Sequence, residues 1–169
     1  MGNKIYPIGI QSFEKIRKDG YFYIDKTALI YKMVKTGSYY FLSRPRRFGK
    51  SLLISTLEAY FQGKKELFEG LAMEKLEKEW RRHPILHMDL NIGKYDTPDS
   101  LDRILNKALT DWEAIYGTGA AETTLALRFA GIIKRAYEQT GERVVILVDE
   151  YDKPMLQAIN NEALQAHFR

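Results

Sequence analysis

The chain of 169 residues contains no cysteine, which excludes a disulfide framework, a thiolate nucleophile and a cysteine zinc site. It contains only three histidines, and none has the helical or turn spacing of a metal-ligand pair. No apolar run approaches the roughly 20 residues that span a membrane, and no hydrophobic signal segment opens the chain. We therefore expect a soluble, cytoplasmic protein without a membrane partner.

The composition indicates one domain, residues 1–169, because 45% of the residues are hydrophobic and the length allows a substantial core. The net charge is +4 and the pI is near 9.1. Arg44, Arg46, Arg47 and Lys50 account for this excess if they contact phosphate. A nucleic-acid groove usually has a longer basic face or interleaved aromatic residues. An ordinary surface with one anion site is therefore favoured over a nucleic-acid surface, which remains an alternative.

The stretch 39–60 has the pattern of a strand, a loop and a helix. The apolar residues 39–43 predict a strand, and residues 52–60 continue as a helix after a basic turn. Gly49, Lys50 and Ser51 match the second half of a phosphate-binding loop. In such a loop the glycine lets the backbone approach the phosphates, the lysine reaches the β and γ oxygens, and the hydroxyl binds Mg²⁺. The predicted nucleotide-binding residues are Arg46, Arg47, Phe48, Gly49, Lys50, Ser51 and Leu52.

The match to the full phosphate-loop pattern is incomplete. Arg44 stands where the pattern has its first glycine, and Pro45 after it supplies no N–H donor. A second element supports the hypothesis: five aliphatic residues, Val144–Val148, precede Asp149 and Glu150. Such a run predicts a parallel strand buried on both faces, with the acids at its carboxyl end. Ligands of open α/β sheets bind at that edge.

The remaining pattern alternates strands and helices, which predicts an α/β fold with a parallel sheet and right-handed crossovers. The expected elements are a strand at 84–90, helices at 97–116 and 120–139, and a last helix from Pro154 to Arg169. His87 and Asp89 share one side of their strand. A metal pair there is less favoured than two satisfied polar residues, and Asp89 is a lesser candidate for the rim of the site.

Four segments together resemble the AAA-ATPase-like domain of bacterial P-loop proteins. They are Ile8–Glu14, Tyr23–Thr27, Ser43–Ser51 and Val148–Pro154, which occur in the order of the family. The resemblance covers nearly the whole chain. The arginine at position 44 is the usual form of that family. The resemblance implies a P-loop NTPase with three layers, α/β/α, around a mainly parallel central sheet, and with ATP and Mg²⁺ as ligands.

The resemblance also implies parts that this chain lacks. Members of the family often continue into a sensor strand, which in related ATPases lies between the phosphate-loop strand and the acidic strand. A PD-(D/E)XK nuclease-like domain often follows. We therefore expect a chain truncated before the sensor strand, with nucleic acid as a partner only through that absent domain. An oligomer is compatible with the sequence.

ATP hydrolysis is the function that these residues favour, since phosphoryl transfer depends on positioning and charge neutralisation. Lys50 and Glu150 are the expected catalytic residues, and Ser51 and Asp149 the metal ligands. A switch or binding module with little turnover is the first alternative, and a nucleic-acid-binding protein the second.

Three further assignments stay open between a structural and a functional role. Asp25 is interpreted as a helix cap more readily than as part of a base pocket. Asp152 is interpreted as a turn residue that could also support the site. For Arg46 and Arg47, a functional role in contact with phosphate or with the site of a neighbouring subunit is as compatible with the sequence as plain surface exposure.

Overall fold

The computed structural model describes residues 5–43, 48–159, 161, 164 and 166. The chain divides into two compact units, Met1–His83 and Pro84–Arg169, and each is described by itself. The described part of the first unit is helical, and the second combines helices with two strands. The assignment of 1–169 to one domain stays a prediction.

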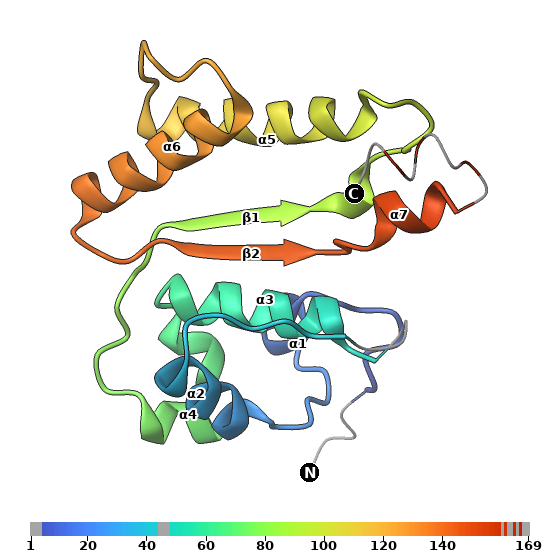
Figure 1. Cartoon of the computed structure of the whole chain (residues 1–169). Coiled ribbons are helices and arrows are strands. Elements are labelled where there is room, and N and C mark those ends of the chain that lie inside the picture. The colour runs from blue at the N-terminus through green and yellow to red at the C-terminus, as the bar shows by residue number, and fades with distance from the viewer. Residues whose placement is uncertain (1–4, 44–47, 160, 162–163, 165, 167–169) are drawn as a thin grey trace. The chain divides into compact units, whose positions relative to one another are not determined.

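The first unit is built from short helices (Figure 1), which pack around aromatic side chains. Its elements are α1 (Phe13–Lys18), α2 (Thr27–Thr36), α3 (Lys50–Phe61), the 3-10 helix η1 (Lys65–Phe68) and α4 (Ala72–Leu76). Phe13, Phe68 and Met73 are completely buried. The rings of Phe13 and Phe68 lie 4.9 Å apart between centroids. Aromatic side chains bury large apolar areas, so a few of them suffice to hold such short helices together.

Asp25 links the start of α2 to the start of α4. Its Oδ1 accepts from the backbone N–H of Thr27 at 2.8 Å and from the Thr27 hydroxyl at 2.6 Å. Its Oδ2 accepts from Ala72 N at 2.7 Å. Burial opposes the charged form, but these bonds outweigh it and hold the pKa of Asp25 below its ordinary value. The N-cap of α2 is Lys26 and not Asp25, so Asp25 has a structural role at the start of α2 but bonds it from one residue before the cap position.

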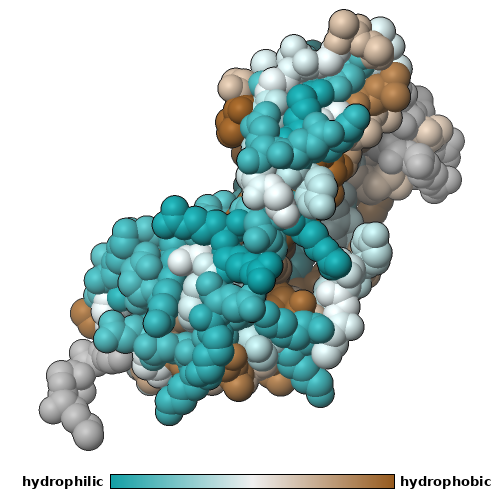
Figure 2. Space-filling view, turned by 90° about the vertical axis from the view of Figure 1, so that its left-hand side faces the viewer, coloured by the Kyte–Doolittle hydropathy of each residue, from teal (hydrophilic) through white to brown (hydrophobic). Residues whose placement is uncertain are grey.

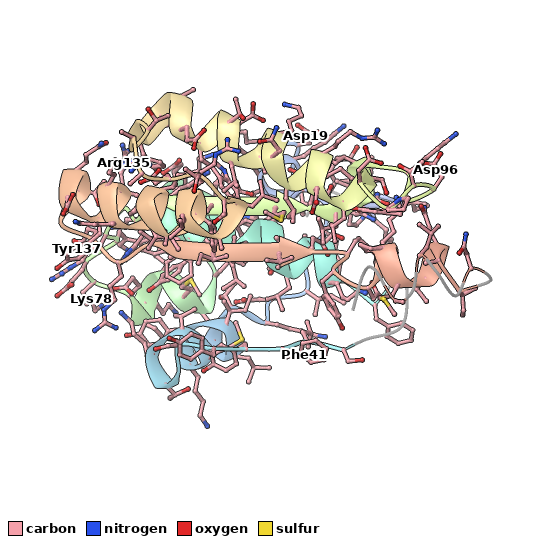
Figure 3. All side chains as sticks on the ribbon, turned by 45° about the horizontal axis from the view of Figure 1, so that its top comes forward. Asp19, Phe41, Lys78, Asp96, Arg135 and Tyr137 are labelled. Carbon is pink, nitrogen blue, oxygen red and sulfur yellow. The ribbon has the colours of Figure 1, made fainter. Side chains whose placement is uncertain are left out.

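The predicted strand at residues 39–43 is wrong. The segment is extended, but it joins no sheet among the described residues. The Tyr40 hydroxyl donates back to the carbonyl oxygen of Met33 on α2 at 2.5 Å, and Tyr39 is 96% exposed. Figure 3 marks Phe41 on the same segment. A strand requires backbone hydrogen bonds to a neighbouring strand, and the sheet of the described residues contains only β1 and β2.

The second unit contains a parallel pair of strands with helices between them in sequence (Figure 1). Its elements are β1 (Ile85–Asp89), the 3-10 helix η2 (Leu90–Ile92), α5 (Ser100–Tyr116), α6 (Leu125–Thr140), β2 (Val145–Asp149) and α7 (Lys153–Gln157). The register pairs Ile85 with Val145 at one end and Asp89 with Asp149 at the other. Both strands therefore end at the same edge, and the predicted parallel pairing is confirmed.

The prediction that the acidic strand is buried on both faces is wrong. Leu86 on β1 is fully buried in a cluster with Leu109, Trp112 and Ile132 from α5 and α6. Its register partner on β2, Ile146, lies on the same face of the sheet but is 45% exposed. The side chains along β2 alternate between exposed and buried after its first residue. The helices therefore bury β1 more completely than β2.

Two ion pairs join α5, α6 and the loop between them. Arg128 on α6 donates from Nε and Nη2 to the two carboxylate oxygens of Glu113 on α5, both at 2.7 Å. Arg135, marked on α6 in Figure 3, forms a similar pair with Glu122 in the loop. These side chains are mostly buried. Bidentate arginine pairs of this kind also restrict orientation, so they fix the two helices against each other.

Two predicted helices differ in their bounds. The helix expected from residue 120 begins at Leu125, because the Thr124 hydroxyl accepts from Leu127 N at 3.2 Å and caps it there. The last helix, expected to run from Pro154 to Arg169, ends at Gln157. The side chain of Asn161 accepts from Leu164 N at 3.1 Å, which is the geometry of a new cap and is not compatible with a continuous helix.

The fold is thus of the mixed α/β class with a small parallel sheet. The visible face in Figure 2 is mostly hydrophilic, with separate hydrophobic areas. No helix in the described part of the chain is long and apolar enough to cross a membrane.

A buried carboxylate stabilises the first unit. Glu77, just after α4, accepts at Oε2 from the Tyr60 hydroxyl at 2.5 Å and pairs with the Lys35 amine at 2.8 Å. Its Oε1 accepts from two backbone N–H groups. Burial opposes the charged form, yet these partners lower the pKa of Glu77 to about 2. Glu77 thereby joins the C-terminal ends of α2, α3 and α4.

We expect Glu77→Gln to destabilise the first unit by about 1.5 to 3 kcal/mol, since it removes the charge from a buried carboxylate that accepts from Tyr60 and from two backbone N–H groups. Because the folded pKa of about 2 lies below the ordinary 4.5, the wild-type contribution is complete above pH 4.5. It disappears as the pH falls from there towards 2. Urea unfolding of both proteins between pH 3 and pH 7 measures this.

Glu79→Gln is the matched control, because Glu79 pairs with Arg81 at the exposed surface and such pairs contribute about 1 kcal/mol or less. Equal stability of wild type and Glu77→Gln at pH 7 would contradict the role of the buried pair.

Candidate nucleotide site

The predicted phosphate loop leads directly into α3. Gly49 is the N-cap of this helix and adopts a left-handed conformation with φ 77° and ψ 24°. Its carbonyl accepts from Leu53 N at 3.0 Å, which closes the first helical turn. Gly49 has no side chain to cap the first N–H groups, and the first turn of α3 contains no acidic residue. The start of α3 thus has the positive electrostatic character of an anion site.

The residues around Gly49 are accessible from this helix end. Phe48 and Gly49 are exposed, and Lys50, Ser51 and Leu52 are half-buried at the first turn. The structure therefore brings together five of the seven predicted nucleotide-binding residues on one loop and helix end. The predicted residues Arg46 and Arg47 lie outside the described residues.

We expect Gly49→Ala to weaken nucleotide binding about tenfold, because a left-handed alanine costs on the order of 1 kcal/mol and the turn then relaxes. The space around Gly49 is open, so the effect comes from the backbone and not from a clash. Nucleotide titration by fluorescence measures it. Gly70→Ala is the matched control, with a φ of +75° and equally open space. If both variants bind nucleotide as the wild type does, the conformation of Gly49 is not needed for binding.

The predicted acidic residues lie at the carboxyl edge of the sheet in the second unit. Asp149 ends β2 and Asp89 ends β1, and the two are register partners. Asp149 is only 9% exposed, and its Oδ1 accepts from the N–H of Glu150 at 2.9 Å. Asp89 Oδ1 accepts from Asn91 N at 2.8 Å. Both strands therefore present a carboxylate at the edge where parallel sheets bind ligands.

Glu150 leaves the strand in an unusual conformation. Its φ is 53°, and among the described residues only Trp80 is another non-glycine residue with positive φ. A left-handed glutamate costs on the order of 1 kcal/mol, and such strain often occurs at functional sites. The turn also ends the strand alternation that would have directed Asp149 and Glu150 to opposite faces.

Sequence analysis did not identify Asn91 and Lys153 as parts of this edge. The Lys153 amine donates to the carbonyl oxygen of Asn91 at 2.5 Å and to Asn91 Oδ1 at 2.7 Å. Lys153 belongs to the resembling segment 148–154, which was the only signal in the sequence. Asn91 follows a strand end by two residues and carried no comparable signal.

Asp152 lies in the turn that leads from β2 to α7. Asp152 is the N-cap of α7 but forms no capping bond. Its Oδ1 is buried and has no hydrogen-bond partner in the described part of the chain. A buried oxygen of this kind is available to a ligand or a water molecule. The structure supports the assignment of Asp152 to a turn, and its supporting role at the site stays a prediction.

Mg²⁺ prefers oxygen ligands and usually takes one or two protein groups together with substrate phosphates. Ser51 and Asp149 supply a hydroxyl and a carboxylate of this type. No group of three or more His, Cys, Asp or Glu side chains suited to a metal occurs among the described residues. Among these residues, the less favoured metal pair of His87 and Asp89 therefore has no third His, Cys, Asp or Glu ligand.

Two surface hollows of the first unit do not involve the phosphate loop. The larger, about 410 Å³, is lined by Arg17, Lys18, Glu66, Leu67 and Glu69. The guanidinium of Arg17 is already used there, because it donates to the carbonyl oxygens of Leu67 and Glu69 at 2.7 and 2.5 Å. The smaller hollow, about 180 Å³, lies between α1 and the C-terminal half of α3. Neither competes with the start of α3 as an anion site.

The chain is similar to a curated protein and to a family model. A curated relative, named "Uncharacterized protein in vnfD 5'region", from Azotobacter chroococcum mcd 1 is 41% identical over 170 residues. The match covers 100% of this chain and 33% of the relative, so the chain spans about a third of the length of that protein. No solved structure matches the chain. The family model described as "Predicted AAA-ATPase" matches residues 7–169, and the chain therefore belongs to the AAA-ATPase-like family.

Proposed function

We propose that this chain binds ATP with Mg²⁺ and hydrolyses it, and that hydrolysis drives an output supplied by a longer protein. The family name supports a function related to ATP. The observation that carries the proposal is the start of α3, where a left-handed Gly49 opens a helix without an acidic first turn. Backbone N–H groups at such a helix end favour a bound phosphate.

The roles of the residues follow from their chemistry. The Lys50 ammonium would neutralise the β and γ oxygens, and the Ser51 hydroxyl and Asp149 carboxylate would hold Mg²⁺. Bound Mg²⁺ would offset the charge of the phosphates. Glu150 would orient and polarise the attacking water. Arg46 and Arg47 would contribute positive charge to phosphate or to a neighbouring subunit.

A titration with a fluorescent ATP analogue tests the proposal. We expect saturable binding that strengthens when Mg²⁺ is added, because Ser51 and Asp149 would hold the metal, which would offset the charge of the phosphates. Release of inorganic phosphate, measured in the same samples, separates an ATPase from a switch with little turnover. Absence of saturable binding with and without Mg²⁺ would refute the nucleotide site.

Nucleic-acid binding by the same loop is the second candidate function. It is favoured by the exposed rings of Tyr39 and Tyr40, which precede the basic loop in the sequence, since single strands bind to aromatic platforms with nearby cations. Oligonucleotide binding that falls steeply with salt and is unaffected by ATP would support this candidate. Competition between ATP and an oligonucleotide would instead indicate that both occupy one anion site.

The three-layer P-loop arrangement is a further part of the proposal. The relative is about three times as long as this chain, and we propose that further strands complete the sheet in the longer protein. Nucleic acid and a second subunit are the proposed partners of that protein. A solved structure of a longer chain whose sheet contains no strand besides β1 and β2 would refute the completed arrangement.

A further inference from the structure

The Lys153 amine forms a bridge between the two segments that follow the strands. Lys153 begins α7 after β2, whereas Asn91 belongs to η2 after β1. One ammonium donates to both the backbone and the side-chain oxygen of Asn91, at 2.5 and 2.7 Å. Holding a lysine side chain in one geometry costs rotamer entropy. Two directed bonds to a single residue therefore indicate a defined structural link and not a side chain that only covers the surface.

Both ends of this bridge are bonded to the acids at the strand ends. On one side, Asn91 N donates to Asp89 Oδ1 at 2.8 Å. On the other side, Lys153 N donates to the carbonyl oxygen of Glu150 at 3.0 Å. Glu150 N in turn donates to Asp149 Oδ1 at 2.9 Å. Because Asp89 and Asp149 are paired in the sheet, these bonds form a closed ring around the carboxyl edge.

Among the residues of this ring, Glu150 has the backbone conformation that requires stabilisation. Its left-handed φ of 53° is disfavoured for a residue with a side chain. If the turn relaxed to an extended conformation, the Glu150 side chain would point to the opposite face of the strand from that of Asp149. We propose that Lys153 and Asn91 are positioning residues that hold the Glu150 turn and thereby fix the direction of its carboxylate. This inference rests on the proposed function, in which that carboxylate orients the attacking water.

Lys153→Met tests the bridge because methionine keeps the apolar length of the side chain and removes its hydrogen-bond donors. Hydrogen exchange of the Glu150 and Lys153 amides, followed by NMR without nucleotide, reports on the turn itself. We expect both amides to exchange about tenfold faster, as fits a local opening that has become easier. Lys134→Met is the matched control, since Lys134 lies on the exposed surface of α6 with a long pair to Glu138.

Steady-state kinetics then show whether the turn matters for hydrolysis. We expect kcat of Lys153→Met to fall about tenfold with little change in KM, because positioning acts on the chemical step. Lys153→Arg, which can still donate to Asn91, should recover part of the loss. In a Glu150→Gln background Lys153→Met should lower kcat no further, since Lys153 acts through the Glu150 carboxylate.

Each outcome decides a separate point. Unchanged exchange of the two amides in Lys153→Met would overturn the inference, and so would an unchanged kcat in a wild-type enzyme that hydrolyses ATP. A further loss of kcat in the Glu150→Gln background would also overturn it, because Lys153 would then act independently. If the wild type does not hydrolyse ATP, the proposed function fails, and the exchange rates alone decide whether the bridge holds the turn.

Discussion

Lys50→Ala is expected to raise the dissociation constant for ATP by about 100-fold or more. A charged hydrogen bond contributes about 1.5 to 3 kcal/mol, and the Lys50 ammonium would make such bonds to both the β and the γ phosphate. The residue lies at the first position of α3, directly after the left-handed Gly49. Its removal therefore takes away the side-chain charge while the helix N-terminus remains. Titration with a fluorescent ATP analogue at fixed Mg²⁺ measures the change.

The control for this experiment is Lys32→Ala, which removes the same charge from an exposed position on α2. We expect Lys32→Ala to bind ATP as the wild type does and both variants to keep the circular dichroism of the wild type. Comparable weakening of ATP binding in the two variants would show that ATP affinity depends only on the net charge of the protein. Full binding by Lys50→Ala would exclude the phosphate-loop assignment of Gly49, Lys50 and Ser51.

Glu150→Gln is expected to lower kcat by about 100-fold or more, because a positioned general base contributes about 10² to 10⁴ in rate. ATP binding should change by no more than about twofold, since glutamine has almost the shape of glutamate and the phosphates are held by other groups. The backbone of Glu150 keeps its bonds to Asp149 and Lys153 in this variant. Phosphate release and nucleotide titration on the same preparation separate the two effects.

Glu138→Gln serves as the comparison, because Glu138 is an exposed residue of α6. It should hydrolyse ATP at the wild-type rate. If Glu150→Gln hydrolyses ATP as fast as the wild type, Glu150 is not the base. If Glu150→Gln loses binding as well as turnover, the carboxylate contributes to nucleotide affinity and the assignment of separate roles is wrong.

The helices were predictable where a cap and an apolar period agree in the sequence. The helix expected at 97–116 is present as Ser100–Tyr116, with Leu109 and Trp112 buried. The strand expected at 84–90 is present as Ile85–Asp89. In both elements local signals suffice. The helix is stabilised by hydrogen bonds within itself, and the strand is marked by a short apolar run between turn residues.

The prediction of a strand at residues 39–43 was wrong because local signals do not suffice there. Its aromatic residues have the β propensity that the prediction used, but propensity does not supply a hydrogen-bonded neighbour. The prediction that β2 is buried on both faces was wrong for a similar reason. Its aliphatic residues are compatible with such burial, yet α5 and α6 cover Leu86 on β1 and leave Ile146 on β2 half exposed. How far a strand is covered depends on elements distant in the sequence.

The sequence by itself determined the family and the parallel pairing, and it supplied the residues of the site that we propose: Gly49 to Ser51 for phosphate, and Asp149 with Glu150 for metal and water. These follow from short motifs, since a motif records which donors and charges are required. Only the tertiary structure decided that Glu150 adopts a left-handed turn and that Lys153 is bonded to Asn91, 62 positions away. The reason is that parallel pairing brings the ends of β1 and β2 together. A local sequence pattern does not predict a contact between residues so far apart in the chain.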